Sequence, residues 1–145
     1  MKKTIIYIIS IVIVICVLIT SKIYENKHYL VEIKKFNTKY EKYISKDIVG
    51  TEVASIINQA VDDNEYERIK KDENGKYIQN NETSINIEVK ITEFKEEQIY
   101  SMETLYQGEM TQFVKYYGQI PFKCAKVEYN ENKRIKYILF EQILQ

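Results

Sequence analysis

An uninterrupted apolar run near the start of the chain restricts the fold more than any other feature of the sequence. Residues 4–19 carry no charge and consist almost entirely of isoleucine, valine and leucine. A helix over residues 4–21 rises roughly 27 Å, close to the thickness of the hydrocarbon core of a bilayer. β-Branched residues disfavour a helix in water, but in lipid every backbone N–H must bond within its own segment. We therefore predict a transmembrane helix at residues 4–21.

The residues around this run favour an anchor that is not cleaved. A secretory signal peptide ends in small residues, whereas branched apolar residues occupy positions 17–19 here. A lipoprotein signal has a small residue before its cysteine, but Ile15 precedes Cys16. Lysines lie on both sides of the run, yet a long domain crosses a membrane largely regardless of its charge. We expect residues 1–21 to be an N-terminal transmembrane anchor, with a cytoplasmic N-terminus and the C-terminal domain outside the cell membrane.

Composition limits the partners and the redox chemistry of the remaining domain. The chain has 21 basic and 21 acidic residues, and without Lys2 and Lys3 the exported part has 19 against 21, a net charge of −2. This balance offers no electrostatic footprint for nucleic acid, so we expect no nucleic-acid partner. Cys16 lies in the anchor and Cys124 in the domain, so a disulfide between them is geometrically excluded. We favour a buried, inert thiol at Cys124 over a reactive one.

Helical spacing continues beyond the anchor. Apolar residues recur at gaps of one, three and four over residues 29–44, and neither glycine nor proline interrupts residues 22–48. The pattern predicts that the transmembrane helix continues as a helical stalk over residues 22–48. Gly50 ends this stretch, and Thr51 is expected to cap a second helix that stops near residues 62–64.

From residue 66 onward the hydrophobic period changes to two. Asn74-Gly75 predicts a tight turn, and the clear apolar–polar alternation of residues 84–92 predicts a half-buried antiparallel strand. The other predicted elements are hairpin arms at 66–70 and 76–78, a strand at 99–106, a short helix at 108–118, and strands at 122–129 and 134–142. The sequence therefore predicts an α+β domain at residues 49–145, with helices packed on an antiparallel sheet of about four to six strands.

No catalytic or metal-binding motif is apparent. His28, the only histidine, falls on the predicted stalk, and the acidic segments 62–65 and 72–74 lack the ligand spacing of a calcium loop. Glu103 and Glu141 fall on predicted strands, where a pair of catalytic carboxylates is the bolder hypothesis and simple exposure the one we favour. We expect no catalytic residues, no cofactor, no metal and no enzymatic activity.

The chain has 13 tyrosines and no tryptophan. Tyrosine is common at interfaces, but most of these tyrosines fall on faces with core periodicity. We favour a tyrosine-rich core over a tyrosine-rich interface.

Several strings resemble small, uncharacterised, membrane-anchored proteins of low-GC Gram-positive bacteria. The strings are Gly50–Val53, Ile57–Asn64, Tyr100–Thr104, Phe122–Cys124 and Phe140–Gln142. The resemblance covers most of the domain and implies a location but no activity. In outline the chain is also similar to type IV pilins and pseudopilins, although it lacks their processing site, and to anchored α+β subunits of secretion channels.

These features lead to two functional hypotheses. The first is a non-enzymatic, single-pass membrane protein whose external domain binds other envelope proteins, as a pilin-like or a secretion- or conjugation-associated subunit. The alternative is a membrane-tethered domain of the cystatin-like or NTF2-like kind, which binds a small ligand in an apolar pocket. An enzyme with dispersed catalytic residues is a third, less favoured hypothesis.

Overall fold

A computed structural model describes residues 2–93 and 96–144. The chain divides into two compact units, Met1–Lys35 and Phe36–Gln145. Helix α1 (Lys2–Ile44) forms the described part of the first unit and contributes its last residues to the second. Each unit is described separately below.

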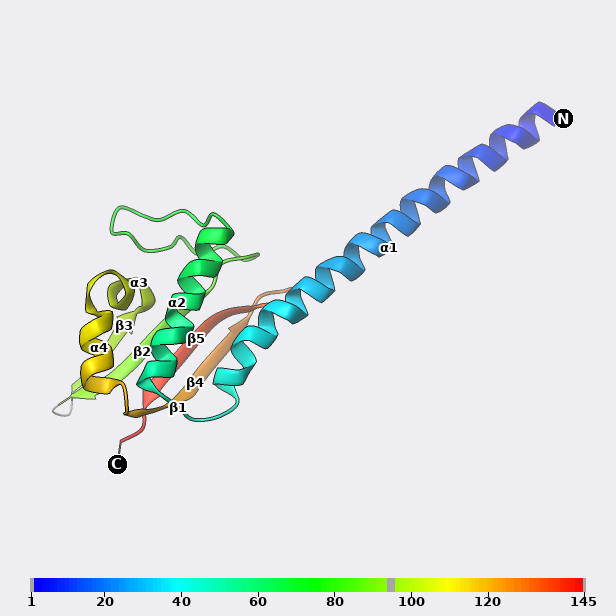
Figure 1. Cartoon of the computed structure of the whole chain (residues 1–145). Coiled ribbons are helices and arrows are strands. Elements are labelled where there is room, and N and C mark those ends of the chain that lie inside the picture. Colours follow the sequence, from blue (N-terminus) through cyan, green and yellow to red (C-terminus); the bar gives the residue numbers. More distant parts are fainter. Residues whose placement is uncertain (1, 94–95, 145) are drawn as a thin grey trace. The chain divides into compact units, whose positions relative to one another are not determined.

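The first unit is a single helix (Figure 1). Among the described residues, α1 is the one helix long and apolar enough to cross a membrane, by length and composition. Most apolar side chains of residues 6–24 are more than half exposed. The hydroxyls of Ser10 and Thr20 donate to the carbonyl oxygens of Ile6 and Cys16, each 2.9 Å away and one turn earlier. These two polar groups are therefore satisfied within the helix itself, as a lipid environment requires.

The second unit contains a five-stranded sheet, which confirms the predicted α+β class. Its strands are β1 (Ile48–Val49), β2 (Asn86–Glu93), β3 (Glu96–Ser101), β4 (Pro121–Tyr129) and β5 (Ile135–Gln142), in the order β1-β4-β5-β2-β3. The sheet is mixed rather than wholly antiparallel as predicted, because β5 pairs with β2 in parallel. The physical reason is the position of β5. It returns antiparallel to β4 and enters between β4 and β2, where it has the direction of β2.

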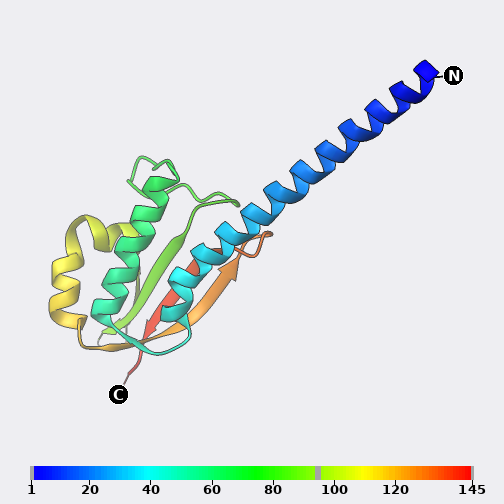
Figure 2. The same cartoon turned by 45° about the vertical axis from the view of Figure 1, so that its right-hand side comes forward.

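The helices of the second unit cover one face of this sheet (Figures 1 and 2). They are α2 (Gly50–Tyr66), α3 (Met102–Thr104), the π-helix η1 (Leu105–Glu109), α4 (Met110–Tyr117) and the end of α1 from Phe36 to Ile44. Alternate β2 residues Ile87, Val89 and Ile91 are buried against them, as the alternation predicts. The intervening residues, including Lys90, lie on the opposite face of the sheet, over which no described helix packs.

Two predicted helices have different starts: α2 has Val49 rather than Thr51 at its N-cap, and the helix predicted at 108–118 is divided between η1 and α4. Three other elements differ more. Helix α1 ends at Ile44, four residues early, because residues 48 and 49 pair with β4 as β1. The predicted hairpin around Gly75, whose φ is 75°, is reduced to one isolated bridge between Lys71 and Tyr77. The strand predicted at 99–106 stops at Ser101, whose hydroxyl accepts a hydrogen bond from the Thr104 N–H and so caps a helical turn.

Candidate functional site

A groove lined by tyrosines opens between α4 and the β2–β3 end of the sheet. Its volume is about 290 Å³. We call it the tyrosine groove, and its lining residues are Ile91, Glu93, Tyr100, Leu105, Gln112, Phe113, Tyr116 and Tyr117. Three of the eight are tyrosines, so the lining combines flat apolar rings with hydroxyl groups. Such a surface is typical of recognition sites.

The sheet supplies one wall of the groove. Tyr100 on β3 pairs with Val89 on β2, and Gln98 pairs with Ile91, so Tyr100 and Ile91 point to the helical face. The Tyr100 hydroxyl donates a hydrogen bond of 2.6 Å to the Gln98 side-chain oxygen. This contact orients the Tyr100 ring along β3.

Two glycines fix the helix that forms the other wall. The N–H groups of Gly50 and Thr51, at the start of α2, donate to the carbonyl oxygens of Ile120 and Gly118, at 3.0 and 3.1 Å. A Cβ atom on Gly50 would lie 2.0 Å from the Tyr117 carbonyl oxygen, so only glycine permits this approach. The end of α4, which carries two of the groove tyrosines, is therefore held against the start of α2.

A π-helix precedes α4 and changes which side chains reach the surface. π-Helical turns are rare and occur often at functional sites. Here Leu105 is 2% exposed, whereas the next residue, Tyr106, is 44% exposed. On α4, Val114 and Tyr116 are also exposed, Tyr116 to 62%. Exposed apolar and aromatic side chains thus lie on η1 and α4, two of the elements that line the groove.

The charge in the groove is acidic. Among the described residues of the lining, Glu93 is the one carboxylate and none is a lysine, arginine or histidine. Glu96 and Glu97 follow on β3, and Glu97 is bound by the Lys90 ammonium at 2.6 Å. The groove and the adjacent edge of the sheet therefore favour a cationic ligand over an anionic one.

A second hollow, of about 240 Å³, lies on the opposite face of the sheet and is polar. Its lining residues are Gln79, Asn80, Asn81, Asn86, Lys126, Glu128, Lys136 and Tyr137. The Tyr137 hydroxyl donates to Glu88 at 2.6 Å, and burial together with Glu88 raises the pKa of Tyr137 well above its usual value. Hydrogen bonding from Lys126 lowers the pKa of Glu128. Glu128 is shared by Lys126 and Lys136, at 2.7 and 3.7 Å, so both lysines of this hollow already have an anionic partner.

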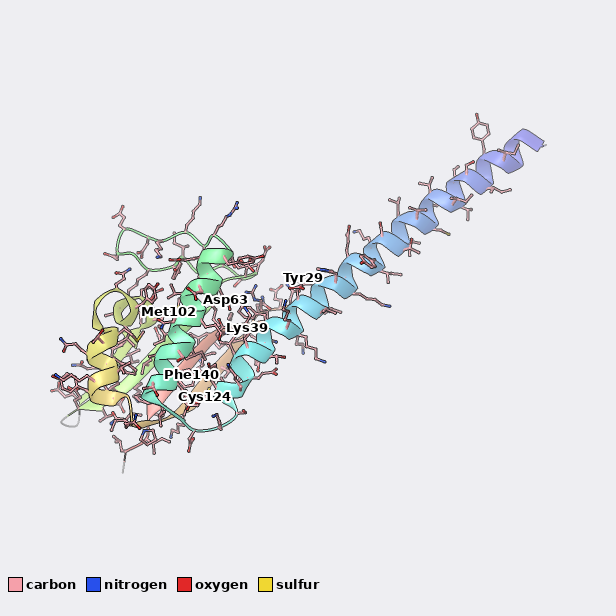
Figure 3. The ribbon with its side chains drawn as sticks, viewed as in Figure 1. Tyr29, Lys39, Asp63, Met102, Cys124 and Phe140 are labelled. Atoms are coloured by element: carbon pink, nitrogen blue, oxygen red, sulfur yellow. The ribbon has the colours of Figure 1, made fainter. Side chains whose placement is uncertain are left out.

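A third polar cluster joins the end of α1 to α2. Tyr40 is fully buried, and its hydroxyl donates to Asp63 at 2.8 Å, while the Lys39 ammonium lies 2.6 Å from the other oxygen of the same carboxylate (Figure 3). Burial, and then Asp63, raises the pKa of Tyr40 far above its usual range. The Arg134 guanidinium stacks 3.6 Å from the centre of the Phe36 ring. These contacts attach residues 36–44 to the domain.

The carboxylates considered from the sequence are not a pair. Glu103 lies in α3 rather than on a strand, where it is buried and accepts a hydrogen bond of 3.1 Å from the Tyr77 N–H. Glu141 lies on β5 and contacts Lys90 and Lys123, at 3.3 and 3.7 Å. The two glutamates thus have separate partners.

The remaining candidates show no shared site. Cys124 is half-buried on β4, and burial raises the pKa of its thiol, which lowers the fraction of reactive thiolate. His28 is exposed on α1. The Asp72 carboxylate accepts hydrogen bonds from the N–H groups of Asn74 and Lys76 and so closes a turn. Within residues 2–93 and 96–144, no three His, Cys, Asp or Glu side chains form a cluster able to hold a metal ion.

The prediction of a tyrosine-rich core is wrong for most tyrosines. Tyr40 and Tyr77 are buried, but the other eleven are half-buried or exposed. The sequence pattern therefore did not identify the three tyrosines of the groove as residues of a surface site. One signal was present in the sequence: Tyr116 and Tyr117 are adjacent on a short helix, where neighbouring residues point about 100° apart and cannot share one narrow buried stripe.

Comparison of this chain with known protein families, with curated proteins and with solved structures finds no match.

Proposed function

We propose that this protein is a single-pass membrane protein whose extracytoplasmic α+β domain binds another protein of the cell envelope through the tyrosine groove. Residues 4–21 span the bilayer, and the N-terminus is cytoplasmic. The domain acts as a non-enzymatic assembly subunit, in the manner of pilin-like or secretion- and conjugation-associated components. The tyrosine groove is the observation that carries the binding role.

The length and surface of α1 support the anchor. An apolar helix with its side chains exposed is costly in water, at about 25 cal/mol for each Å² of apolar surface, and is stable in lipid. The internal hydrogen bonds of Ser10 and Thr20 remove the main polar cost of burying this segment in hydrocarbon.

The lining of the groove supports protein binding over the binding of a small ligand. Tyrosine is enriched at the energetic centres of protein interfaces. A small-molecule pocket encloses most of its ligand, whereas this groove is open to solvent and one of its lining residues, Tyr116, is 62% exposed. The small-ligand alternative, a cystatin-like or NTF2-like pocket, is therefore the weaker one.

The first experiment tests membrane topology. A cysteine replaces Tyr66, which is 85% exposed, in full-length protein that also carries Cys124→Ser. Intact cells are then treated with a membrane-impermeant maleimide. We expect labelling of Tyr66→Cys and none of a matched cysteine placed beside Lys2. Labelling only after lysis would refute the external location of the domain.

The second experiment tests the groove. A photoreactive phenylalanine replaces Tyr116 in the full-length protein in cells, and the same replacement at Tyr129, exposed on β4, is the control. We expect a discrete adduct of one partner from position 116 and not from position 129. Absence of any adduct, or the same adducts from both positions, would contradict binding through the groove.

A further inference from the structure

We infer that the occupant of the tyrosine groove is an extended segment of the partner, which adds as a sixth strand to the free edge of β3 and turns both apolar and basic side chains toward the groove. The inference rests on the proposed function and names the chemistry of the partner. It follows from three observations: the edge, the groove beside it, and the charge of both.

The edge of β3 is regular and open. β3 is the last strand of the sheet, and in the described part of the chain it pairs with β2 alone. Its pairing, from Glu96 opposite Glu93 to Ser101 opposite Glu88, has no shift in register. Such an edge presents a continuous row of N–H and C=O groups to an added strand.

The opposite edge of the sheet is protected. β1 pairs with the first two residues of β4, and register shifts interrupt β4 between Cys124 and Lys126 and again between Glu128 and Tyr129. Bulges of this kind bend an edge and discourage further pairing. Of the two edges, β3 is therefore the one suited to strand addition.

The groove lies where the side chains of an added strand would point. Alternate residues of a strand face opposite sides of a sheet. On the helical side, Tyr100 of β3 and Tyr116 of α4 line the groove, so inward residues of the added strand enter an aromatic slot. On the other side, Ile99 is 59% exposed and offers an apolar contact to outward residues. The main chain would supply affinity, and the groove would select apolar inward side chains.

The charge selects a further position on the groove side. Glu93 and Glu96 are paired across β2 and β3 and therefore point to the same helical face as Ile91. Within the described residues neither forms an ion pair, whereas Glu97 is held by Lys90. Both carboxylates are therefore available to a side chain that the added strand turns toward the groove. Lysine or arginine in the segment would complement them, and an acidic segment would be repelled.

The test uses the full-length protein in phosphatidylcholine nanodiscs and fluorescent synthetic peptides. The probe is Thr-Lys-Thr-Phe-Thr-Val-Thr, in which the lysine, phenylalanine and valine share one face of the strand. The charge control replaces the lysine by glutamate, and the backbone control is N-methylated at alternate amides along one edge. Empty nanodiscs measure binding to lipid. Fluorescence anisotropy gives the dissociation constants.

We expect the probe to bind, and both controls to bind at least about tenfold more weakly, since a tenfold loss corresponds to about one or two hydrogen bonds. Tyr116→Ala and Glu93→Gln should each weaken binding about tenfold, and Tyr129→Ala should leave it unchanged. Circular dichroism checks that each variant folds.

Several results would overturn the inference. They are absence of probe binding, equal binding of the N-methylated peptide, and binding insensitive to Tyr116→Ala. Self-association of the protein in nanodiscs that Ile99→Pro abolishes would identify a second copy as the occupant and would also overturn it. An adduct at position 116 in cells, combined with any of these results, would leave the proposed function standing. Loss of that adduct as well would remove both.

Discussion

One quantitative prediction concerns Asn64, whose buried side chain hydrogen-bonds to the backbone N–H and C=O of Ile85, as a neighbouring strand would. Asn64 is fully buried near the end of α2, and its amide donates to the Ile85 carbonyl at 2.8 Å and accepts from the Ile85 N–H at 2.9 Å. Ile85 is itself fully buried, one residue before β2 begins. Asn64→Ala leaves both backbone groups without a partner.

The expected loss of stability follows from the Ile85 N–H and C=O groups. Each buried polar group left unsatisfied costs about 1–3 kcal/mol, so the loss of two partners in Asn64→Ala should lower the free energy of unfolding by about 2–6 kcal/mol. A typical domain has about 5–15 kcal/mol in all. With a urea slope of about 1–3 kcal/mol per molar, the midpoint should fall by more than about 0.7 M.

The assay is urea unfolding of the full-length protein in mild detergent, followed by the near-UV circular dichroism of its tyrosines. Asn58→Ala is the matched control, because Asn58 is exposed on the same helix and its loss should change stability by less than about 0.7 kcal/mol. A loss below about 1 kcal/mol for Asn64→Ala would refute the reasoning, since it would mean that water or a shifted backbone satisfies Ile85.

Four other changes test separate features of the domain. Gly50→Ala should destabilise the domain by more than about 2 kcal/mol in the same assay, because its Cβ would overlap a carbonyl oxygen of α4. Gly108→Ala, with no atom within 4 Å of its Cβ, should be neutral or stabilising by up to about 1 kcal/mol. The Cys124 thiol, whose pKa is raised by burial, should react with iodoacetamide at pH 8 at least about tenfold more slowly in the folded protein than in urea, as measured by mass spectrometry; equal rates would contradict an inert thiol. A hydrogen bond from the N–H at the N-cap of α2, and then Lys46, lowers the pKa of Glu52, so its contribution is complete above the unfolded pKa and is lost as pH falls through the lower folded pKa. Glu52→Gln should therefore destabilise the domain at pH 7, by less than about 1 kcal/mol because the side chain is largely solvated, and the difference should vanish at acidic pH.

The periodic parts of the fold were predictable from the sequence. The alternation at residues 84–92 predicts both ends of β2 to within two residues. The helical spacing after Gly50 predicts the start of α2 equally well, but the helix ends at Tyr66, beyond the predicted stop near residues 62–64. These patterns report one buried face, which local spacing records directly. The end of α1 was less predictable, because pairing of Ile48 with Phe122 overrides a helical pattern that has no breaker before Gly50.

The neighbours in the sheet and the tyrosine groove were not predictable in this way. The parallel pairing of β5 with β2 joins Asn86 to Tyr137, and no local pattern encodes such a distant partner. The groove brings Ile91 of β2 and Tyr100 of β3 together with Phe113 and Tyr116 of α4, and no local pattern encodes this juxtaposition.

The position of β5 has a consequence for the order in which the domain is made. β5 follows the other four strands in the chain, yet it lies in the middle of the sheet, between β4 and β2. Until residues 135–142 have been synthesised, β1 and β4 have no contact through the sheet with β2 and β3, and the buried residue Phe140 is missing from the core. The five-stranded sheet therefore cannot be completed until residues 135–142 are available. If the domain crosses a membrane while it is being made, an incomplete sheet leaves less folded structure for a translocation channel to accommodate.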